Sequence, residues 1–389
     1  MKAFTPVKTA LIGSGAISGI YLENCCKHFN ILDVVGCSDI KPERAKARAE
    51  QYGIRTMTNE EILSDPSIEL VINTTYPTAH YKVSKAALQA GKHVYSEKMI
   101  AVTLEQAREL VDLSHQTGKY LCAAPDTFLG AGLQTARGLL DSGIIGRPMA
   151  ADFILVRGYR HSEFHTDPEK RFVFFPGGGI LFDVGCYYLT ALVSMLGPIS
   201  QVAGFDQTDT PERPFRNPVN PNYGQIMTIE SPNQFAGALQ FENGVLCSLL
   251  TSSEGINVTN HFTIYGSTGT LTLNDPNTFG GPIYVQTKGS PNAMEMPLTH
   301  AWTDNMRGLG IADLAYAIRN ERQPRCHMDM AFHTYEAAIG VSISCQTGST
   351  YRMTSSCRRP EPLEVGHTEY PEAALNLLAT ESPETVLDL

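Results

Sequence analysis

The stretch "VKTALIGSGAIS", residues 7 to 18, decides the fold. Its first six residues are mostly apolar and predict a short buried strand, and the "GSGAIS" that follows opens a helical segment. Gly13 permits a tight turn after the strand, and Gly15 lets the backbone approach a phosphate closely. Ser18 stands where the dinucleotide fingerprint prefers a third Gly or Ala, and it is small enough for close packing. Because the following helix would point its N-terminal amides at a pyrophosphate, this turn predicts a dinucleotide site.

Strand-like and helix-like segments alternate from this turn to about residue 125. We expect strands at 7–12, 33–38, 69–74, 92–96 and 119–124, and helices at 16–29, 41–53, 81–91 and 103–118. This order predicts an α/β fold, a doubly wound parallel sheet with helices on both faces.

Asp39 lies 24 residues after Gly15, at the end of the second expected strand. A carboxylate at this place accepts hydrogen bonds from the adenosine ribose hydroxyls and repels a 2'-phosphate, so we expect NAD rather than NADP. Residues that directly follow strands of such a sheet face the cofactor. This adds a set of expected cofactor contacts in the loops: Ala16, Ile17, Thr75, Tyr76, Pro77, His80, Glu97 and Lys98.

Composition and charge limit the classes of function. A chain of 389 residues exceeds the size of one hydrophobic core, so two domains are expected. A formal charge of -10, with no run of Lys and Arg, argues against nucleic-acid binding, and no apolar stretch approaches the roughly 20 residues of a membrane span. Nine scattered cysteines without a CxxC pair, and an N-terminus without a signal-type segment, predict a cytoplasmic protein.

The stretch "VYSEKMI", residues 94 to 100, places Lys98 just after an expected buried strand. The carboxyl ends of parallel strands line the ligand crevice, so this ammonium is expected to face the cofactor and the substrate. The alternative is a solvated surface lysine that pairs with Glu97.

Several motifs, taken in their order along the chain, resemble the Gfo/Idh/MocA oxidoreductases, which include glucose-fructose oxidoreductase and inositol dehydrogenase. They span residues 7 to about 350 and are "GSGAIS", "CSDIKPERA", "TTYPTAHY", "SEKMI", "SGIIGRP", "GGGILFDVGCYYLT" and "YGSTGTL". The resemblance implies a Rossmann domain at 1–125 and a C-terminal α+β domain at 126–355 with an open, mostly antiparallel sheet. That sheet would line the substrate pocket and support a homo-oligomer, a dimer or a tetramer. Residues 356–389 form an acidic tail, and hairpins are expected at 240–252 and 261–273.

This chain departs from the family pattern at two places. The usual Glu-Lys-Pro is Glu97, Lys98 and Met99, so the Pro is lost and the Lys remains. The frequent Asp-x-Gly-x-His motif is "DVGCY", in which Tyr187 occupies the His position. A Tyr there is familiar from the glucose-fructose oxidoreductase and dihydrodiol dehydrogenase branches of the family.

Oxidation of a secondary alcohol needs a base that takes the hydroxyl proton while hydride leaves for the nicotinamide. We hypothesise that Tyr187 relays the proton, Lys98 orients the hydroxyl and tunes Tyr187, and Asp183 holds Lys98 or a substrate hydroxyl. Lys98 as the acid/base is the open alternative. Asp183 could instead cap a helix, and Tyr187 could be a buried aromatic residue with Tyr188 in its place.

Residues 157 to 179 form the polar and aromatic stretch "RGYRHSEFHTDPEKRFVFFPGGG". A related segment runs along the pocket in family members, so the resemblance implies that Arg160, His161 and His165 bind substrate hydroxyls, unless the stretch is a plain surface loop. His161 and His165 could share a metal, but turn residues separate them, so no metal is expected. Asp304, Asn305 and Arg307, ahead of an expected helix within 304–324, are further pocket residues.

The predicted function is an NAD-dependent dehydrogenase that transfers hydride between a sugar, glycoside or cyclitol and the nicotinamide. One alternative within the same family is an NAD-retaining glycosidase that acts by transient oxidation and elimination. A second alternative is a regulator that binds the dinucleotide without turnover.

Overall fold

The computed structural model describes residues 5–158 and 171–365. Its N-terminal part is a six-stranded sheet in the order β3-β2-β1-β4-β5-β6, and every pair is parallel. The strands are β1 Val7–Ile12, β2 Leu32–Ser38, β3 Arg55–Thr56, β4 Leu70–Asn73, β5 His93–Ser96 and β6 Leu121–Ala123. The parallel sheet that the alternation predicts is therefore confirmed.

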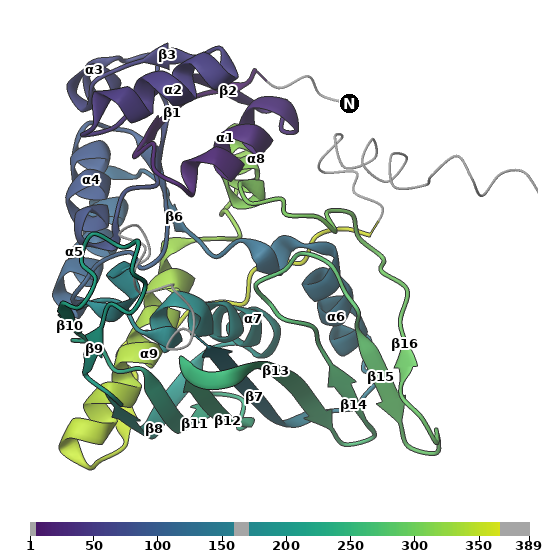
Figure 1. The fold of residues 1–389 in the computed structure, drawn as a ribbon. Helices are drawn as coiled ribbons and strands as arrows, with labels where there is room; N and C mark the ends of the chain where they lie inside the picture. Colours follow the sequence, from purple (N-terminus) through teal and green to yellow (C-terminus); the bar gives the residue numbers. More distant parts are fainter. Residues whose placement is uncertain (1–4, 159–170, 366–389) are drawn as a thin grey trace, which may run out of the picture.

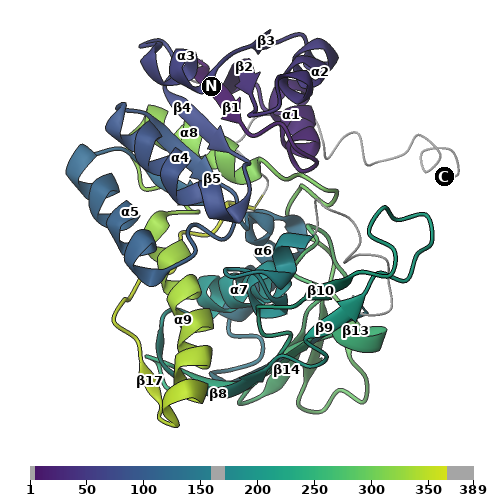
Figure 2. The ribbon, with the colours of Figure 1, turned by 60° about the vertical axis from the view of Figure 1, so that its left-hand side comes forward.

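Helices cover both faces of this sheet. The N-terminal helices are α1 Ser18–Lys27, α2 Pro42–Tyr52, α3 Asn59–Ser64, α4 Pro77–Gln89 and α5 Leu104–Thr117. Figure 1 shows α4 and α5 on one side, and α1 with α8 (Leu309–Asn320) on the other. Helix α8 comes late in the sequence but packs on β5 and β6 (Figure 2). The N-terminal sheet is thus completed by a helix from the last third of the chain.

The sequence pattern misses β3 and α3. Strand β3 has only two residues, too few for a periodic signal. Helix α3 begins with a capping box, in which Thr58 accepts a hydrogen bond from the amide of Glu61, and Glu61 accepts one from the amide of Thr58. The T-x-x-E spacing of this capping box was the available signal.

The C-terminal part is built on a nine-stranded sheet in the order β16-β15-β14-β13-β7-β12-β11-β8-β17. β7 and β12 pair in parallel, and the other neighbours in this sheet pair antiparallel. Both expected hairpins are present, with Gly244 in the left-handed region (φ 88°) between β11 and β12. The strands are β7 Pro148–Gly158, β8 Ile199–Gln207, β11 Gln234–Phe241, β12 Leu246–Ser252, β13 Glu254–Gly266, β14 Gly269–Thr272, β15 Tyr284–Thr287, β16 Met294–Glu295 and β17 Tyr351–Arg352, with a separate hairpin of β9 Glu212–Pro214 and β10 Ile226–Thr228.

Three helices lie on one side of the nine-stranded sheet, between it and the N-terminal domain (Figure 1). They are α6 Ala131–Asp141, α7 Cys186–Leu196 and α9 Met328–Thr347, and short turns are formed by η1 Thr127–Leu129, η3 Arg171–Phe174 and η4 Leu181–Gly185. In both views, no helix of the described residues lies on the opposite side of the sheet (Figures 1 and 2). Among the helices of the described ranges, none is long and apolar enough to cross a membrane.

The described part of the tail packs on the C-terminal domain. Leu363 is buried, and its amide donates to Oε1 of Gln134 on α6 at 2.8 Å. Arg325 donates to the carbonyl oxygens of Glu361 and Pro362. The chain up to Leu363 therefore belongs to the folded domain, and residues 366–389 lie outside the described ranges.

Candidate active site

The turn after β1 is pressed against the loop after β4. Gly13 has a φ of 102°, and a Cβ at this position would lie 2.6 Å from the backbone nitrogen of Thr75 and 2.8 Å from the carbonyl oxygen of Thr74. Its amide donates to the carbonyl oxygen of Ser38 at 2.9 Å. Because backbone atoms surround the missing Cβ, only glycine fits here without a shift of the loop.

The backbone of Gly15, in contrast, has free space beside it. Of the described atoms, only the Arg44 guanidinium comes within 4.0 Å of a Cβ built on Gly15. Arg48 donates to the Gly15 carbonyl oxygen at 3.5 Å. Helix α1 has no side-chain cap and no acidic residue in its first turn. Space, a bare helix N-terminus and two guanidinium groups fit the pyrophosphate of a dinucleotide.

Asp39 is fixed beside this turn by the backbone. Its Oδ2 accepts from the amide of Ser14 and its Oδ1 from the amide of Lys41, both at 2.8 Å. Each oxygen keeps a lone pair for a ribose hydroxyl. The carboxylate therefore lies next to the glycine turn, as the fingerprint requires.

Three large apolar side chains are exposed around this turn. Ile17, Ile40 and Tyr76 expose 40%, 89% and 41% of their surface, and they follow β1, β2 and β4. Such side chains suit the flat faces of a dinucleotide's rings. Ile17 and Tyr76 are among the residues expected from the sequence. Ile40 is not, and its one signal is an isolated apolar residue directly after Asp39.

His80 joins two of the loops instead of pointing into solvent. The side chain is buried, with Nδ1 2.6 Å from the Met99 carbonyl oxygen and Nε2 2.8 Å from the Thr75 carbonyl oxygen. Burial lowers the pKa of His80, against the two carbonyl contacts. His80 thus ties the loop after β4 to the loop after β5, while Tyr76 and Pro77 form the start of α4. Direct cofactor contacts by these residues stay predictions.

Glu97 is buried and shapes the loop after β5. Its Oε1 accepts from the Tyr21 hydroxyl on α1 at 2.6 Å, and its Oε2 accepts from the amide of Lys98 at 3.0 Å. The peptide bond between Lys98 and Met99 is cis. The carboxylate therefore fixes the backbone at Lys98 and leaves the ammonium free for another partner.

That partner is Asp183, so the interpretation of Lys98 as a surface lysine paired to Glu97 is wrong. Nζ of Lys98 lies 2.6 Å from Oδ1 and 2.8 Å from the carbonyl oxygen of Asp183, and the two side chains are 15% and 12% exposed. Burial disfavours the charge, but the attraction of Asp183, then of Tyr187, outweighs it and holds the pKa of Lys98 well above its ordinary value. Lys98 is therefore a fixed cation.

Tyr187 lies over the same ammonium. Asp183 stands in the single π-helical turn η4 and Tyr187 in the first turn of α7, with Nζ of Lys98 5.7 Å from the ring centroid of Tyr187. Burial raises the pKa of Tyr187 to about 12, although Lys98 and then Arg307 oppose the rise. Tyr188, in contrast, is fully buried and stacks on Phe153 at 4.8 Å, so Tyr187 is the tyrosine at the site.

Arg307 is a second cation beside Tyr187. Its Nη2 donates to the Tyr187 hydroxyl at 3.3 Å and to Oδ1 of Asn277 at 2.6 Å, and its Nη1 donates to Oδ1 of Asn305 at 2.6 Å. Asn305 and Arg307 are pocket residues expected from the sequence. Asn277 is not among the expected residues, because it stands in a loop without a motif. Asp304 forms no hydrogen bond or ion pair in the described part of the chain.

The expected substrate residues Arg160, His161 and His165 lie outside the described ranges. Arg157, just before them, donates to Oδ2 of Asp275 at 2.8 Å and to Oδ1 of Asn260 at 2.5 Å. Within residues 5–158 and 171–365, no three His, Cys, Asp or Glu side chains converge as metal ligands.

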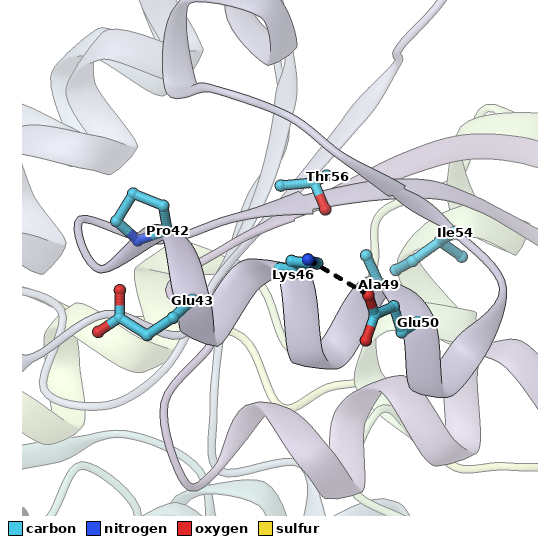
Figure 3. A pocket seen from close by; sticks show the side chains of 7 residues that line it. All are labelled: Pro42, Glu43, Lys46, Ala49, Glu50, Ile54 and Thr56. Carbon is cyan, nitrogen blue, oxygen red and sulfur yellow. Dashed lines mark ion pairs between the residues drawn. The ribbon is translucent and has the colours of Figure 1, made fainter.

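A surface hollow of about 490 Å³ lies elsewhere, between α2 and the loop and strand that follow it (Figure 3). An ion pair of Lys46 and Glu50, 3.8 Å apart, borders it. It is lined by Pro42, Glu43, Lys46, Ala49, Glu50, Ile54 and Thr56. None of these residues belongs to the cluster of Lys98, Asp183 and Tyr187, so the hollow is separate from the candidate active site.

Two family models match the chain. Residues 7–124 match the oxidoreductase family with an NAD-binding Rossmann fold, and residues 133–272 match the GFO/IDH/MocA C-terminal domain. Together they include every residue of the Lys98, Asp183 and Tyr187 cluster.

Two curated relatives carry named activities. Inositol 2-dehydrogenase/D-chiro-inositol 3-dehydrogenase of Lactiplantibacillus plantarum is 28% identical over 173 residues, 42% of this chain and 46% of the relative. D-glucoside 3-dehydrogenase of Escherichia coli is 30% identical over 203 residues, 50% of this chain and 55% of the relative. The chain thus spans about half the length of the curated relatives it matches.

A solved structure of levoglucosan dehydrogenase in complex with NADH and L-sorbose has a TM-score of 0.76. The likeness covers 90% of this chain and 99% of that chain at 17% identity, so it shows the fold alone.

The two glycines predict different effects of the same substitution. Gly13→Ala should lower the melting temperature by on the order of 5 °C, because its Cβ meets backbone atoms at a positive φ. Gly15→Ala should leave the melting temperature of the free protein unchanged but weaken dinucleotide binding at least ~10-fold, because its Cβ takes space meant for the phosphate. Thermal unfolding and calorimetric titration with NAD measure the two effects. Equal effects of both variants on stability would contradict the assignment.

Proposed function

Because the chain belongs to the Gfo/Idh/MocA family of NAD-binding oxidoreductases, we propose that it is an NAD-dependent dehydrogenase of a sugar, glycoside or cyclitol. The observation that carries the proposal is the buried Lys98–Asp183 pair, 2.6 Å between Nζ and Oδ1, beside the Tyr187 ring. A charged pair at this depth next to a titratable hydroxyl is typical of proton-transfer sites. It lies after β5, at the carboxyl edge that also carries the glycine turn and Asp39.

The substrate class is supported by the names of the relatives. They act on inositols and glucosides, and the structural neighbour is named for levoglucosan. All three are rings with several hydroxyl groups. The hydrogen-bonding side chains beside Tyr187, Arg307 and its partner Asn277, suit such a ring.

The geometry gives each residue a role. A bound nicotinamide supplies the hydride acceptor or donor. Tyr187 exchanges the proton with the hydroxyl or carbonyl oxygen on the reacting carbon of the substrate, because its own hydroxyl is the titratable group next to two cations. Lys98, whose charge is stabilised by the adjacent Asp183, orients that oxygen. Asp183 holds Lys98 in place through two contacts.

We assign NAD as the cofactor and the cytoplasm as the location. The Asp39 carboxylate is held beside Ser14, where a 2'-phosphate would be repelled. All nine cysteines are free thiols, and eight of them are at least partly shielded from solvent, which suits a reducing compartment.

The first test measures NADH formation at 340 nm with NAD and a panel of hexoses, glycosides and inositols. We expect substrate-dependent NADH, and Lys98→Ala and Tyr187→Phe should each lower kcat/KM at least ~100-fold. Lys85→Ala, on the exposed side of α4, is the matched control and should keep full activity. Circular dichroism and NAD titration check that the variants fold. Release of an aglycone without net NADH would point to the NAD-retaining glycosidase, and bound NAD without any turnover to the regulator.

Cofactor choice is tested by Asp39→Asn. This variant keeps the shape of the side chain and removes its charge, so affinity for NADP should rise relative to NAD by ~10-fold, about 1.4 kcal/mol. Asp33→Asn, an exposed acid at the start of β2, is the control. Calorimetric titrations with both cofactors give the ratio. A wild-type preference for NADP would refute the assignment of NAD.

We also propose that the bare face of the nine-stranded sheet joins two copies of the chain. Phe205, Ala236, Leu250 and Ile154 are neighbours across β8, β11, β12 and β7, and they form an apolar row on that face. Phe205 and Leu250 expose 76% and 42% of their surface. A continuous exposed apolar row on a sheet is typical of a protein interface.

Light scattering coupled to size exclusion tests this interface. The wild-type chain should have at least twice the mass of the monomer. The double variant Phe205→Asp with Leu250→Asp should be monomeric, because the interface would bury two charges from each copy. Val219→Asp, at an 87% exposed position between β9 and β10, should not change the mass. A monomeric wild type, or an unchanged mass in the double variant, would exclude this interface.

A further inference from the structure

Two cations flank the Tyr187 phenol from different parts of the chain. Lys98 comes from the loop after β5, with Nζ 5.7 Å from the ring centroid. Arg307 comes from the segment before α8, with Cζ 5.8 Å from the same centroid and Nη2 3.3 Å from the hydroxyl oxygen. Of the two, Arg307 is the one whose hydrogen bond reaches the oxygen that exchanges the proton.

The Arg307 backbone is anchored on two sides. The side-chain Nδ2 of Asn24 on α1 donates to the carbonyl oxygens of Asn305 and Arg307 at 2.9 and 2.8 Å. The buried Asp126 carboxylate accepts from the amides of Gly308 and Gly310 at 2.8 and 3.0 Å. These contacts fix the position of Arg307 relative to the N-terminal domain, so the guanidinium is held in place before a substrate binds.

The hydrogen-bond partners of the guanidinium are neutral. They are the amide oxygens of Asn305 and Asn277, the carbonyl oxygen of Asn277 and the Tyr187 hydroxyl. In the described part of the chain, no carboxylate forms an ion pair with Arg307. The charge of Lys98, in contrast, is shared with Asp183. The positive charge of Arg307 is therefore not neutralised by a neighbouring carboxylate and can act on the Tyr187 oxygen.

The Tyr187 hydroxyl uses only part of its hydrogen-bonding capacity. Its oxygen accepts from Arg307, and no described residue accepts its proton. A phenol can donate one hydrogen bond and accept others. The hydroxyl proton of Tyr187 can therefore be donated to an oxygen of the substrate, while Arg307 donates a hydrogen bond to the Tyr187 oxygen.

We propose that Arg307 is a catalytic residue that stabilises the Tyr187 phenolate during proton transfer. The inference rests on the proposed dehydrogenase function. In the oxidation, the substrate O–H bond breaks and its proton forms the O–H bond of Tyr187, while the C–H hydride passes to an oxidised nicotinamide and the C=O bond forms. In the reduction, Tyr187 returns the proton, and Arg307 stabilises the phenolate that remains.

The phenolate can be tested without any substrate. A difluorinated tyrosine incorporated at position 187 titrates at a lower pH than tyrosine, and its fluorine NMR signal reports the titration of this one ring. In Arg307→Met the midpoint should rise by at least one pH unit, because a cation that hydrogen-bonds to the phenolate is lost. Arg307→Lys, which keeps the charge, should give a smaller rise. Arg108→Met removes a distant guanidinium that contacts Thr354 and Phe332, and it should leave the midpoint unchanged.

The second measurement uses the substrate found in the 340 nm panel. In Arg307→Met, kcat/KM for oxidation should fall at least 10-fold at neutral pH and recover as the pH rises, with an unchanged KM for NAD. An unchanged fluorine midpoint, or a loss of activity that is equal at every pH, would overturn the proposal.

If Arg307→Met does not fold, it is replaced by Asn277→Ala, which removes one hydrogen-bond partner of the guanidinium. An unchanged midpoint in Asn277→Ala then has the same meaning. A protein without dehydrogenase activity still gives the fluorine titration, so failure of the function and failure of this inference are distinguishable.

Discussion

The ion pair of Lys98 and Asp183 is the contact on which the site depends. Lys98 belongs to the loop after β5 of the N-terminal sheet, and Asp183 to the turn before α7 of the C-terminal domain. Loss of one partner of a buried pair leaves an uncompensated charge, which costs about 3–5 kcal/mol. The pair therefore holds the two domains in a register that places Tyr187 at the carboxyl edge of the parallel sheet. Glu97 contributes indirectly, because its carboxylate accepts from Tyr21 and from the Lys98 amide and so fixes the loop that carries the ammonium.

A second set of buried contacts supports the same junction from the other side. Asp126 follows β6, and it accepts the amides of Gly308 and Gly310 at the start of α8. Burial raises the pKa of Asp126, against the two amide hydrogen bonds. Through these contacts the segment that carries Arg307 is fixed to the N-terminal domain, although it comes about 180 residues later in the chain. The candidate site is thus built where three distant segments meet, and none of them forms it alone.

The features that could be predicted from the sequence are those that depend on residues close together in the chain. The turn at Gly13 and Gly15, the carboxylate at Asp39 and the strand before Lys98 are local patterns, and the structure places them as expected. Asp183 and Tyr187 needed the family resemblance, because nothing local distinguishes Tyr187 from Tyr188. Asn277, Ile40 and the docking of α8 on β5 and β6 depend on tertiary packing, which leaves no periodic trace in the sequence. The pairing of Lys98 with Asp183 was one of the two partners that we expected for Asp183, the other being a substrate hydroxyl, and the structure shows this contact.

In the proposed reaction, the opposition between burial and charge at Tyr187 determines what this residue does in each direction. Burial raises the pKa of Tyr187 to about 12, so at neutral pH the resting residue is a phenol that can donate its proton to a carbonyl oxygen. Oxidation needs the phenolate, the form that burial disfavours and that Lys98 and Arg307 favour. If Tyr187 were only buried, its proton would be held so strongly that the residue would serve reduction alone. If it were exposed beside the two cations, the phenol would lose its proton to water and could not act as the acid. With a desolvated ring and two fixed cations, one residue can act as the acid in one direction and as the base in the other.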